Sequence, residues 1–461
     1  MRSLTITTAV LSFVASAAGA ATVLGTGGAI TLTASETDGI VVRNDTDVTQ
    51  NSGTSVSVQS GATPGAIVED TSTLSVNGTI TGGELTNAER FEQAGDGVQV
   101  QDDGAVFVSG GTVIGGAASG FEDPEGGFGI SATGNSTVSV TGGLVIGGAG
   151  SAEDEDGRGG DGIRAFGNTT ILVDGGIVEG GTSSASDDDS VAGQGVDASG
   201  NAMVTLQSGE IRGGSTATGE DAGLALLLRD DASFHMTGGK LVGGDSVDEE
   251  GGAIAANGTG LASITIEGGE ISTGAPAGFF GSTLLQLSQS SLNISGGTFT
   301  STGQIVGDFQ STGTISGGTF IGSNPSLMFA LFNSTFDISG GTFTPGSDAF
   351  RTGDVLSVFG SSLIDISGGM FNGDFSLGGT TDLIVRGSNL SFENGFLTGI
   401  LADSSAISVN IQLFDDAEVI LAPVVPLPAG WLFLATGIGA LTWRRLAETE
   451  RRSAPAATAN V

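Results

Sequence analysis

Acidic side chains are the first residues of this chain whose type and spacing suggest chemistry. Asp and Glu supply 51 of 461 residues against 14 Lys and Arg, which gives a net charge of −37. The densest acidic runs are Glu153, Asp154, Glu155 and Asp156, and Asp187, Asp188 and Asp189. Carboxylate oxygens on Gly-rich loops are ligands that Ca²⁺ accepts. A solvated acidic edge without bound metal is the other interpretation of these runs.

Paired carboxylates could also hydrolyse glycosides if a cleft held two of them about 5 or 6.5–9.5 Å apart. Enzymes that act on acidic polysaccharides also need cationic side chains, and the chain has one Lys, Lys240, and one His, His235. Both stand at outward positions of alternating patterns, so we expect them at the surface. We therefore predict a protein without enzymatic activity, and a polysaccharide lyase or glycoside hydrolase is the alternative. The net charge excludes nucleic acid as a partner, because its phosphates would be repelled.

A repeated unit must position the acidic runs. The pattern apolar-x-apolar-x-Gly-Gly-x-apolar recurs, and its second Gly marks eleven units, at Gly78, Gly111, Gly143, Gly176, Gly209, Gly239, Gly269, Gly297, Gly318, Gly341 and Gly369. An apolar column lies two residues after this mark, from Val113 to Phe371. A polar column lies eight residues before it, from Asp103 to Ser361, and is broken at Leu261. A second apolar column lies thirteen residues before it, at Val98, Ile130, Ile163, Val196, Leu226, Leu284, Ile305, Met328 and Leu356.

This repeat predicts an all-β fold. Alternation of apolar and polar residues indicates short half-buried strands, and units of 21–33 residues can bury that face only by stacking on one another. We predict a single parallel β-solenoid, a right-handed β-helix of about eleven rungs, across residues 21–415; a series of β-sandwiches is the alternative. The polar column should form a hydrogen-bonded ladder and the Phe residues a stack. The variable segments of the first six units hold 22 of the 51 acids and should leave the rod at one edge. The repeats resemble those of secreted β-helix proteins such as autotransporter passengers.

The N-terminus has the pattern of a secretory signal peptide. Met1 and Arg2 give a positive start, Leu4–Ala18 is largely apolar, and small residues at Ala18 and Ala20 fit cleavage before Ala21. We therefore expect residues 1–20 to be removed on export. The chain has no Cys, so no disulfide would support the exported protein.

The C-terminus has the pattern of a second targeting signal. The motif Val425, Pro426, Leu427, Pro428 and Ala429 precedes an apolar run that ends at Arg444 and Arg445. As a helix, Ala429–Trp443 would span roughly 22 Å of a bilayer core of about 30 Å, with the Arg pair on the cytoplasmic side. Motif, apolar run and Arg pair resemble the sorting signal of the PEP-CTERM class, in its VPLPA variant. The resemblance implies that an exosortase, a membrane protease-transpeptidase, recognises and processes the tail. Sixteen residues, 446–461, follow the Arg pair, unlike most such tails, and a plain anchor helix is the alternative.

These features together predict an exported, non-enzymatic protein of the cell surface or extracellular matrix. After the repeat domain we expect a linker at 416–424, the sorting signal at 425–445 and a cytoplasmic tail at 446–461. The protein would belong to a Gram-negative cell envelope, first anchored in the membrane and then at the surface or outside the cell. Expected partners are the exosortase-type protease and, from the family resemblance, exopolysaccharide or other surface components in matrix formation or adhesion. Ca²⁺ is the one candidate cofactor.

Overall fold

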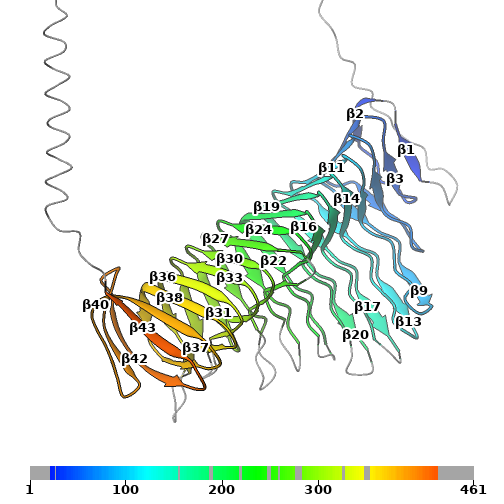
Figure 1. Cartoon of the computed structure of the whole chain (residues 1–461). Helices are drawn as coiled ribbons and strands as arrows, with labels where there is room; N and C mark the ends of the chain where they lie inside the picture. The colour runs from blue at the N-terminus through cyan, green and yellow to red at the C-terminus, as the bar shows by residue number, and fades with distance from the viewer. Residues whose placement is uncertain are drawn as a thin grey trace, which may run out of the picture.

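The rod is built from strands alone. The computed structural model describes residues 21–25, 27–153, 156–185, 190–217, 221–246, 251–257, 260–275, 283–323, 328–346 and 353–423. Within these ranges every regular element is a β-strand, and the strands form one 39-stranded sheet and one 4-stranded sheet. Figure 1 shows them stacked along an elongated rod, from the N-terminal end in blue to the C-terminal end in orange. The predicted all-β, parallel architecture is thereby confirmed.

Each repeat crosses three faces of the rod in turn, and each strand pairs in parallel with its counterpart one repeat away. The first face contains β1(Thr22–Leu24), β3(Ile40–Val42), β6(Ala66–Val68), β10(Val98–Val100), β14(Ile130–Gly134), β18(Ile163–Gly167), β21(Val196–Gly200), β23(Leu226–Leu228), β26(Ile254–Ala256), β29(Leu285–Ser288), β32(Val306–Phe309), β35(Phe329–Phe332), β37(Asp354–Phe359), β39(Asp374–Leu377) and β42(Ala406–Leu413). The second face contains β2(Gly28–Leu32), β4(Thr46–Gln50), β7(Thr73–Val76), β11(Ala105–Val108), β15(Thr137–Val140), β19(Thr170–Glu179), β22(Met203–Arg212), β24(Ser233–Met236), β27(Ser263–Ile266), β30(Ser291–Ile294), β33(Thr312–Ile315), β36(Thr335–Thr344), β38(Leu363–Phe371), β40(Asp382–Glu393) and β43(Glu418–Pro423). The third face contains β5(Ser55–Ser57), β8(Thr79–Thr81), β12(Thr112–Ile114), β16(Leu144–Ile146), β25(Lys240–Val242), β28(Glu270–Ser272), β31(Thr298–Ser301) and β34(Thr319–Gly322), and β19, β22, β36 and β38 run on into it from the second face.

The apolar column after the Gly mark stacks as predicted. Val113 pairs with Val145 and Val145 with Val178, and all three side chains are fully buried. At the C-terminal end the same column holds Phe299, Phe320, Phe343 and Phe371. Their rings stack with centroids 4.7–4.8 Å apart. The aromatic stack is therefore confirmed as a core element.

The polar column forms the predicted ladder. The Nδ2 group of Asn135 donates to Asp103 at 3.0 Å, that of Asn168 to Asn135 at 2.9 Å, and that of Asn201 to Asn168 at 3.1 Å. Where Leu261 interrupts the column, its backbone N–H donates to Asp231 Oδ1 at 3.0 Å instead. Hydrogen bonds to the Asn and Asp side chains of this column thus join one rung to the next at the turn.

The prediction of the second apolar column is correct up to Leu226 and at Leu356, but it is wrong at three positions between them. We expected Leu284, Ile305 and Met328, but the paired residues are Leu285, Val306 and Phe329, which follow Ile254 in the ladder. In each of these rungs two adjacent apolar residues are both buried, because the chain turns a corner there. An alternating pattern cannot distinguish the ladder residue from its buried neighbour.

The C-terminal end of the stack departs from the parallel arrangement. The strand β41(Phe396–Leu401) pairs antiparallel with both β40 and β42, and these are the antiparallel pairings among the described strands. Leu397, Ile407 and Val409 of this antiparallel meander are buried against the core. Residues 418–423, which we expected in a linker, form β43 and pair in parallel with β40. The linker prediction is wrong here, since β43 continues the second face.

Candidate functional site

A thin projection leaves the N-terminal half of the rod at one edge. We call it the fin; it consists of residues 82–97, 115–129, 147–153, 156–162, 180–185, 190–195, 213–217, 221–225, 243–246 and 251–253. Its outer part contains the 4-stranded parallel sheet of β9(Leu85–Ala88), β13(Ala118–Gly120), β17(Gly150–Ala152) and β20(Ser183–Ser184) (Figure 1). The common edge predicted for the variable segments is confirmed. The sequence pattern does not reveal this sheet, because its strands are short and β13, β17 and β20 consist of Gly, Ser and Ala.

Backbone hydrogen bonds between glycines hold the neck of the fin. In each rung the chain passes outward through one glycine pair and returns through another glycine. The returning Gly127 donates to Gly116 of its own rung at 2.8 Å, and Gly148 of the next rung donates to Gly127 at 2.7 Å. The same alternation continues from Gly83 to Gly274. We call this segment the glycine neck.

The glycine neck has no room for side chains. A Cβ atom on Gly147 would lie 1.8 Å from the carbonyl oxygen of Gly160, and one on Gly148 would lie 1.9 Å from that of Gly116. Real Cβ atoms do not approach backbone oxygens so closely. Neither glycine has a positive φ, so lateral space and not backbone conformation requires glycine here. This close contact explains the paired glycines that follow β8, β12, β16, β19, β22 and β25.

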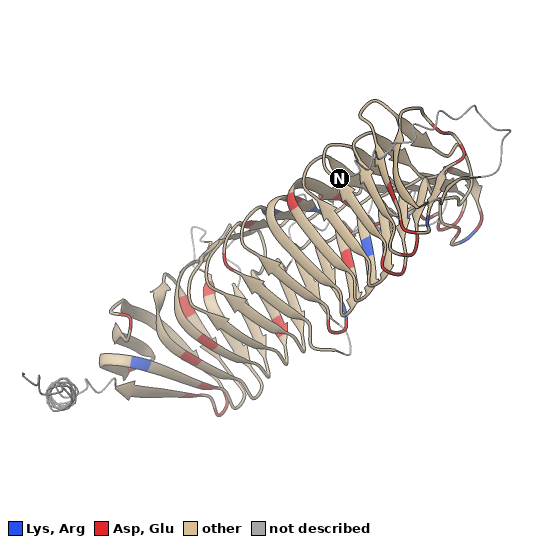
Figure 2. Ribbon diagram, turned by 90° about the horizontal axis from the view of Figure 1, so that it is seen from above, with Lys and Arg blue, Asp and Glu red and all other residues tan. Residues whose placement is uncertain are grey.

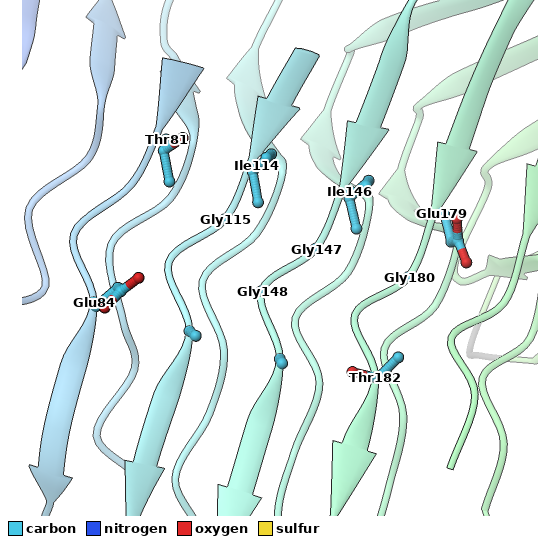
Figure 3. A pocket seen from close by; sticks show the side chains of 12 residues that line it. Thr81, Glu84, Ile114, Gly115, Ile146, Gly147, Gly148, Glu179, Gly180 and Thr182 are labelled. Atoms are coloured by element: carbon cyan, nitrogen blue, oxygen red, sulfur yellow. The ribbon is translucent and has the colours of Figure 1, made fainter. Parts of the chain in front are cut away.

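A shallow groove of about 520 Å³ runs along one flank of the glycine neck (Figure 3). One wall is formed by Thr81, Ile114, Ile146 and Glu179 at the ends of third-face strands, and the other by Glu84, Ala117, Ala149 and Thr182. Glycines of the neck form its floor. The groove therefore offers an apolar surface with a carboxylate near each end, and it contains no paired acid and base.

The opposite flank holds a network of charges between the fin and the first face. The Arg164 guanidinium binds Asp161 at 2.8 Å, lies 3.7 Å from Asp197, and packs 3.9 Å over the Phe128 ring. Arg229 lies 3.2 Å from the same oxygen of Asp197. Glu125 lies 4.0 Å from Arg164. The network thus joins four successive rungs through side chains.

Burial changes the acidity of this network. Burial first, and then the negative charge of Asp161, raise the pKa of Asp197 to about 6. Burial also raises the pKa of Asp161, Glu125 and Asp96. Asp197 Oδ1 has no hydrogen-bond partner among the residues described, so no hydrogen bond to this oxygen offsets its burial.

The network is better suited to fixing the fin than to catalysis. Asp161 and Asp197 keep 5% and 4% of their side-chain surface, because the two guanidinium groups cover them. Asp161 Oδ1 accepts the backbone N–H of Gln194 at 2.8 Å, and Asp96 Oδ1 accepts that of Phe128 at 2.9 Å. These carboxylates cap the backbone of the following rung.

The predicted metal ligands are placed only in part. Asp156 lies 3.7 Å from Arg158, and Glu153 follows the end of β17, where its N–H donates to Gly120 at 3.0 Å. Asp154, Glu155, Asp187, Asp188 and Asp189 lie outside the described residues. Within the described ranges, no three His, Cys, Asp or Glu side chains are grouped closely enough to hold a metal ion. Of the acids we assigned to the exposed edge, Asp96, Asp123 and Asp161 are buried instead.

Of the other residues predicted from the sequence, some are placed by the structure and some lie outside the described residues. Lys240 and His235 lie on the outer surface, 2.8 Å from Glu270 and 3.3 Å from Glu267. The cleavage positions Ala18 and Ala20 lie outside the described residues. So do all residues of the sorting motif, Val425–Ala429, Arg444 and Arg445. Across the described part of the chain we find no helix with the length and apolar character needed to cross a bilayer.

Comparison of the chain with protein-family models, with curated proteins and with solved structures finds no match in any of the three. The functional argument therefore depends on the residues and on the geometry of the rod. Figure 2 shows that acidic positions, in red, are more frequent than basic positions, in blue, along the described rod.

Proposed function

We propose that the protein is an exported, non-enzymatic scaffold of the cell surface or extracellular matrix, with the fold of a right-handed parallel β-solenoid. The in-register pairing of strands across repeats supports the solenoid interpretation. A solenoid of this kind is rigid along its axis, because each rung contacts its neighbours through backbone ladders and a continuous core. Such a rod suits spacing and display, and it needs no catalytic residue.

The observation that carries this proposal is the locked fin. Hydrogen bonds between glycines and the Arg164 network both hold the fin at a fixed angle to the rod. The acidic segments are thereby presented in register along one edge. Exposed carboxylates along this edge can bind divalent cations or the cation-bridged polysaccharides of a matrix.

Location follows from the two ends of the chain. Residues 1–20 direct export, and the apolar run at 429–443 forms a transmembrane helix that holds the tail in the membrane. An exosortase-type protease then cleaves within or beside Val425–Ala429. Pro426 and Pro428 favour an extended backbone that a protease can bind. The protein is then placed at the cell surface or outside the cell, with exopolysaccharide among its partners.

Mass spectrometry of the mature C-terminus tests the sorting proposal. We expect mature protein that lacks Gly430–Val461, and a Pro426→Ala, Pro428→Ala variant that stays uncleaved in the membrane. Deletion of 425–461 should release the protein into the periplasm or medium. Peptides covering Ser453–Val461 in most of the mature protein would instead identify a permanent anchor helix.

A polysaccharide lyase or glycoside hydrolase remains the second candidate, since Asp161, Asp197 and Arg164 do form a carboxylate–arginine cluster. The discriminating measurement is release of reducing ends or unsaturated sugars from acidic polysaccharides. We expect none from the wild-type chain. Activity that disappears in Asp161→Asn and Asp197→Asn variants with unchanged melting curves would favour the enzyme.

A further inference from the structure

A line of exposed phenylalanines runs along the first face near the C-terminal end of the rod. Phe309, Phe332, Phe359 and Phe414 are 44%, 43%, 41% and 48% exposed. Phe309 pairs in register with Phe332, and Phe332 with Phe359. The next rung has Gly378 at this position, and the Phe359 ring occupies the space that a side chain there would need. Phe414 lies on the opposite side of Gly378. We call these four residues the aromatic stripe.

The exposed area of the aromatic stripe is unusual for a monomer. A Phe side chain buries about 150–250 Å² when fully covered, so four rings at these exposures leave on the order of 350 Å² of aromatic surface. Continuous patches of about 300–600 Å² are the largest that monomers usually show, and they often mark interaction sites. Other exposed aromatic residues of the rod, such as Phe107, stand between Ser residues of adjacent rungs.

Beside Phe309, Phe332 and Phe359 the neighbouring columns hold no charged residue, and the adjacent column reads Gln286, Gly307, Ala330 and Ser357. Charge returns at the C-terminal end of the stripe, where Ser376 donates to Asp354 at 2.8 Å and the exposed Asp415 follows Phe414. On the other side lie the ladder residues Gln289, Gln310, Asn333 and Ser361, which bond to one another or to the next rung. This neutral strip stands out on a chain with a net charge of −37.

The ring geometry favours an apolar protein partner over a sugar chain. Phe309 and Phe332 stack face to face, with centroids 5.5 Å apart and planes inclined by 8°. Each of these two rings therefore has one face covered by the other ring, which reduces the free aromatic face on which a sugar could pack. The small residues beside the rings suit packing against a second apolar surface.

We propose that the aromatic stripe and its neutral strip form the contact between two copies of this chain, packed side by side. Like-charge repulsion opposes contact between two such acidic rods on most surfaces, but the columns beside Phe309, Phe332 and Phe359 hold no charged residue. A straight stripe is also self-complementary: a two-fold axis perpendicular to the rod would pack it against itself, as in most homodimers. The buried aromatic rings supply the apolar centre of the contact, and the Gln and Asn ladder supplies its polar rim.

Disulfide trapping tests this contact in the full-length protein, because the natural chain has no Cys. A single Ala330→Cys substitution places a thiol in the neutral strip. Thr314→Cys, at an exposed position of the second face, is the matched control. After mild oxidation of cells or purified protein, we expect a dimer band on a non-reducing gel from Ala330→Cys, many-fold stronger than from Thr314→Cys.

A second substitution tests whether the dimer depends on the aromatic rings. Adding Phe332→Asp to Ala330→Cys should abolish the dimer band, whereas adding Phe107→Asp, at a similarly exposed but isolated ring, should leave it. Unchanged melting curves would show that both variants fold. Equal trapping at both Cys positions, or a dimer that survives Phe332→Asp, would overturn the proposal. A monomeric chain whose retardation by polysaccharide in native gels depends on Phe332 would identify a sugar chain as the occupant instead.

Discussion

At the scale of single residues, Asp308 conflicts with its surroundings. It occupies an inward position of β32, between Leu287 and Leu331 of the adjacent rungs. Neither of its oxygens has a hydrogen-bond partner of good geometry among the described residues, although Ser311 and Ser334 lie near enough to reduce the pKa shift. Burial dominates and raises the pKa of Asp308. The carboxyl group is therefore better tolerated with its proton than without it.

We predict that removing this carboxyl group stabilises the rod at neutral and alkaline pH. The folded state holds the Asp308 proton to higher pH than the unfolded chain does. This contribution to stability is therefore present in acid and is lost as pH rises through the raised pKa. Asp308→Leu should increase the free energy of unfolding by about 1–3 kcal/mol at pH 8 and change it little at pH 4. Denaturation at both pH values, with the exposed Asp337→Asn as control, checks this. A gain that is equal at both values would contradict the titration argument.

Adding a carboxyl group to the buried Phe column should have the opposite effect on stability. Phe320 is fully buried between Phe299 and Phe343. Phe320→Asp should lower the free energy of unfolding by several kcal/mol, because it places an unpaired charge inside the aromatic stack. Thr319→Asp, at the exposed neighbouring position, should change it by less than about 0.5 kcal/mol. Chemical denaturation followed by circular dichroism measures both, and similar losses in the two variants would contradict the assigned facing of β34.

At the scale of elements, the fin depends on its glycine neck. The Cβ of Gly148→Ala would overlap the carbonyl oxygen of Gly116 in the preceding rung. We predict that this substitution separates the outgoing and returning segments of the fin, which the glycine hydrogen bonds hold together. The neighbouring Ala149→Ser, at an exposed position, should leave them in place. Limited proteolysis should then cleave Gly148→Ala within residues 147–162 much faster than the wild type. Equal cleavage rates would show that the neck tolerates a methyl group.

Sequence patterns predict the elements unequally, for physical reasons. The Val113 column and the Asn135 ladder were predictable, because one side chain in each rung has a strict chemical requirement. The choice between Leu284 and Leu285 was not, since both are buried. The glycine neck was not predicted, because glycine at such density suggests flexible loops. The signal for it in the sequence is the repeat of paired glycines directly after β8, β12, β16, β19, β22 and β25. The sequence does not distinguish a buried carboxylate such as Asp161 from an exposed edge residue, because only the folded arrangement brings Arg164 and Arg229 to this cluster.

At the scale of the whole molecule, charge is the dominant property. If the acidic edge binds Ca²⁺, millimolar Ca²⁺ should raise the melting temperature by linkage, and EDTA should reverse the shift. Deletion of Glu153–Asp156 should reduce it. NaCl of equal ionic strength controls for screening of the net charge. Identical melting curves with and without Ca²⁺ would leave the solvated edge as the interpretation of these residues.

The antiparallel meander at the end of the stack has a consequence for the order of folding. Elsewhere in the described chain each strand must find a partner one repeat away, which is slow because a loop must close first. In β40–β41–β42 the partners are adjacent in sequence, and hairpins of this kind form within microseconds. The meander can therefore act as the nucleus on which rungs are added toward the N-terminus. A chain that crosses a membrane N-terminus first would then stay unfolded until its last segment emerges, so that translocation need not compete with folding.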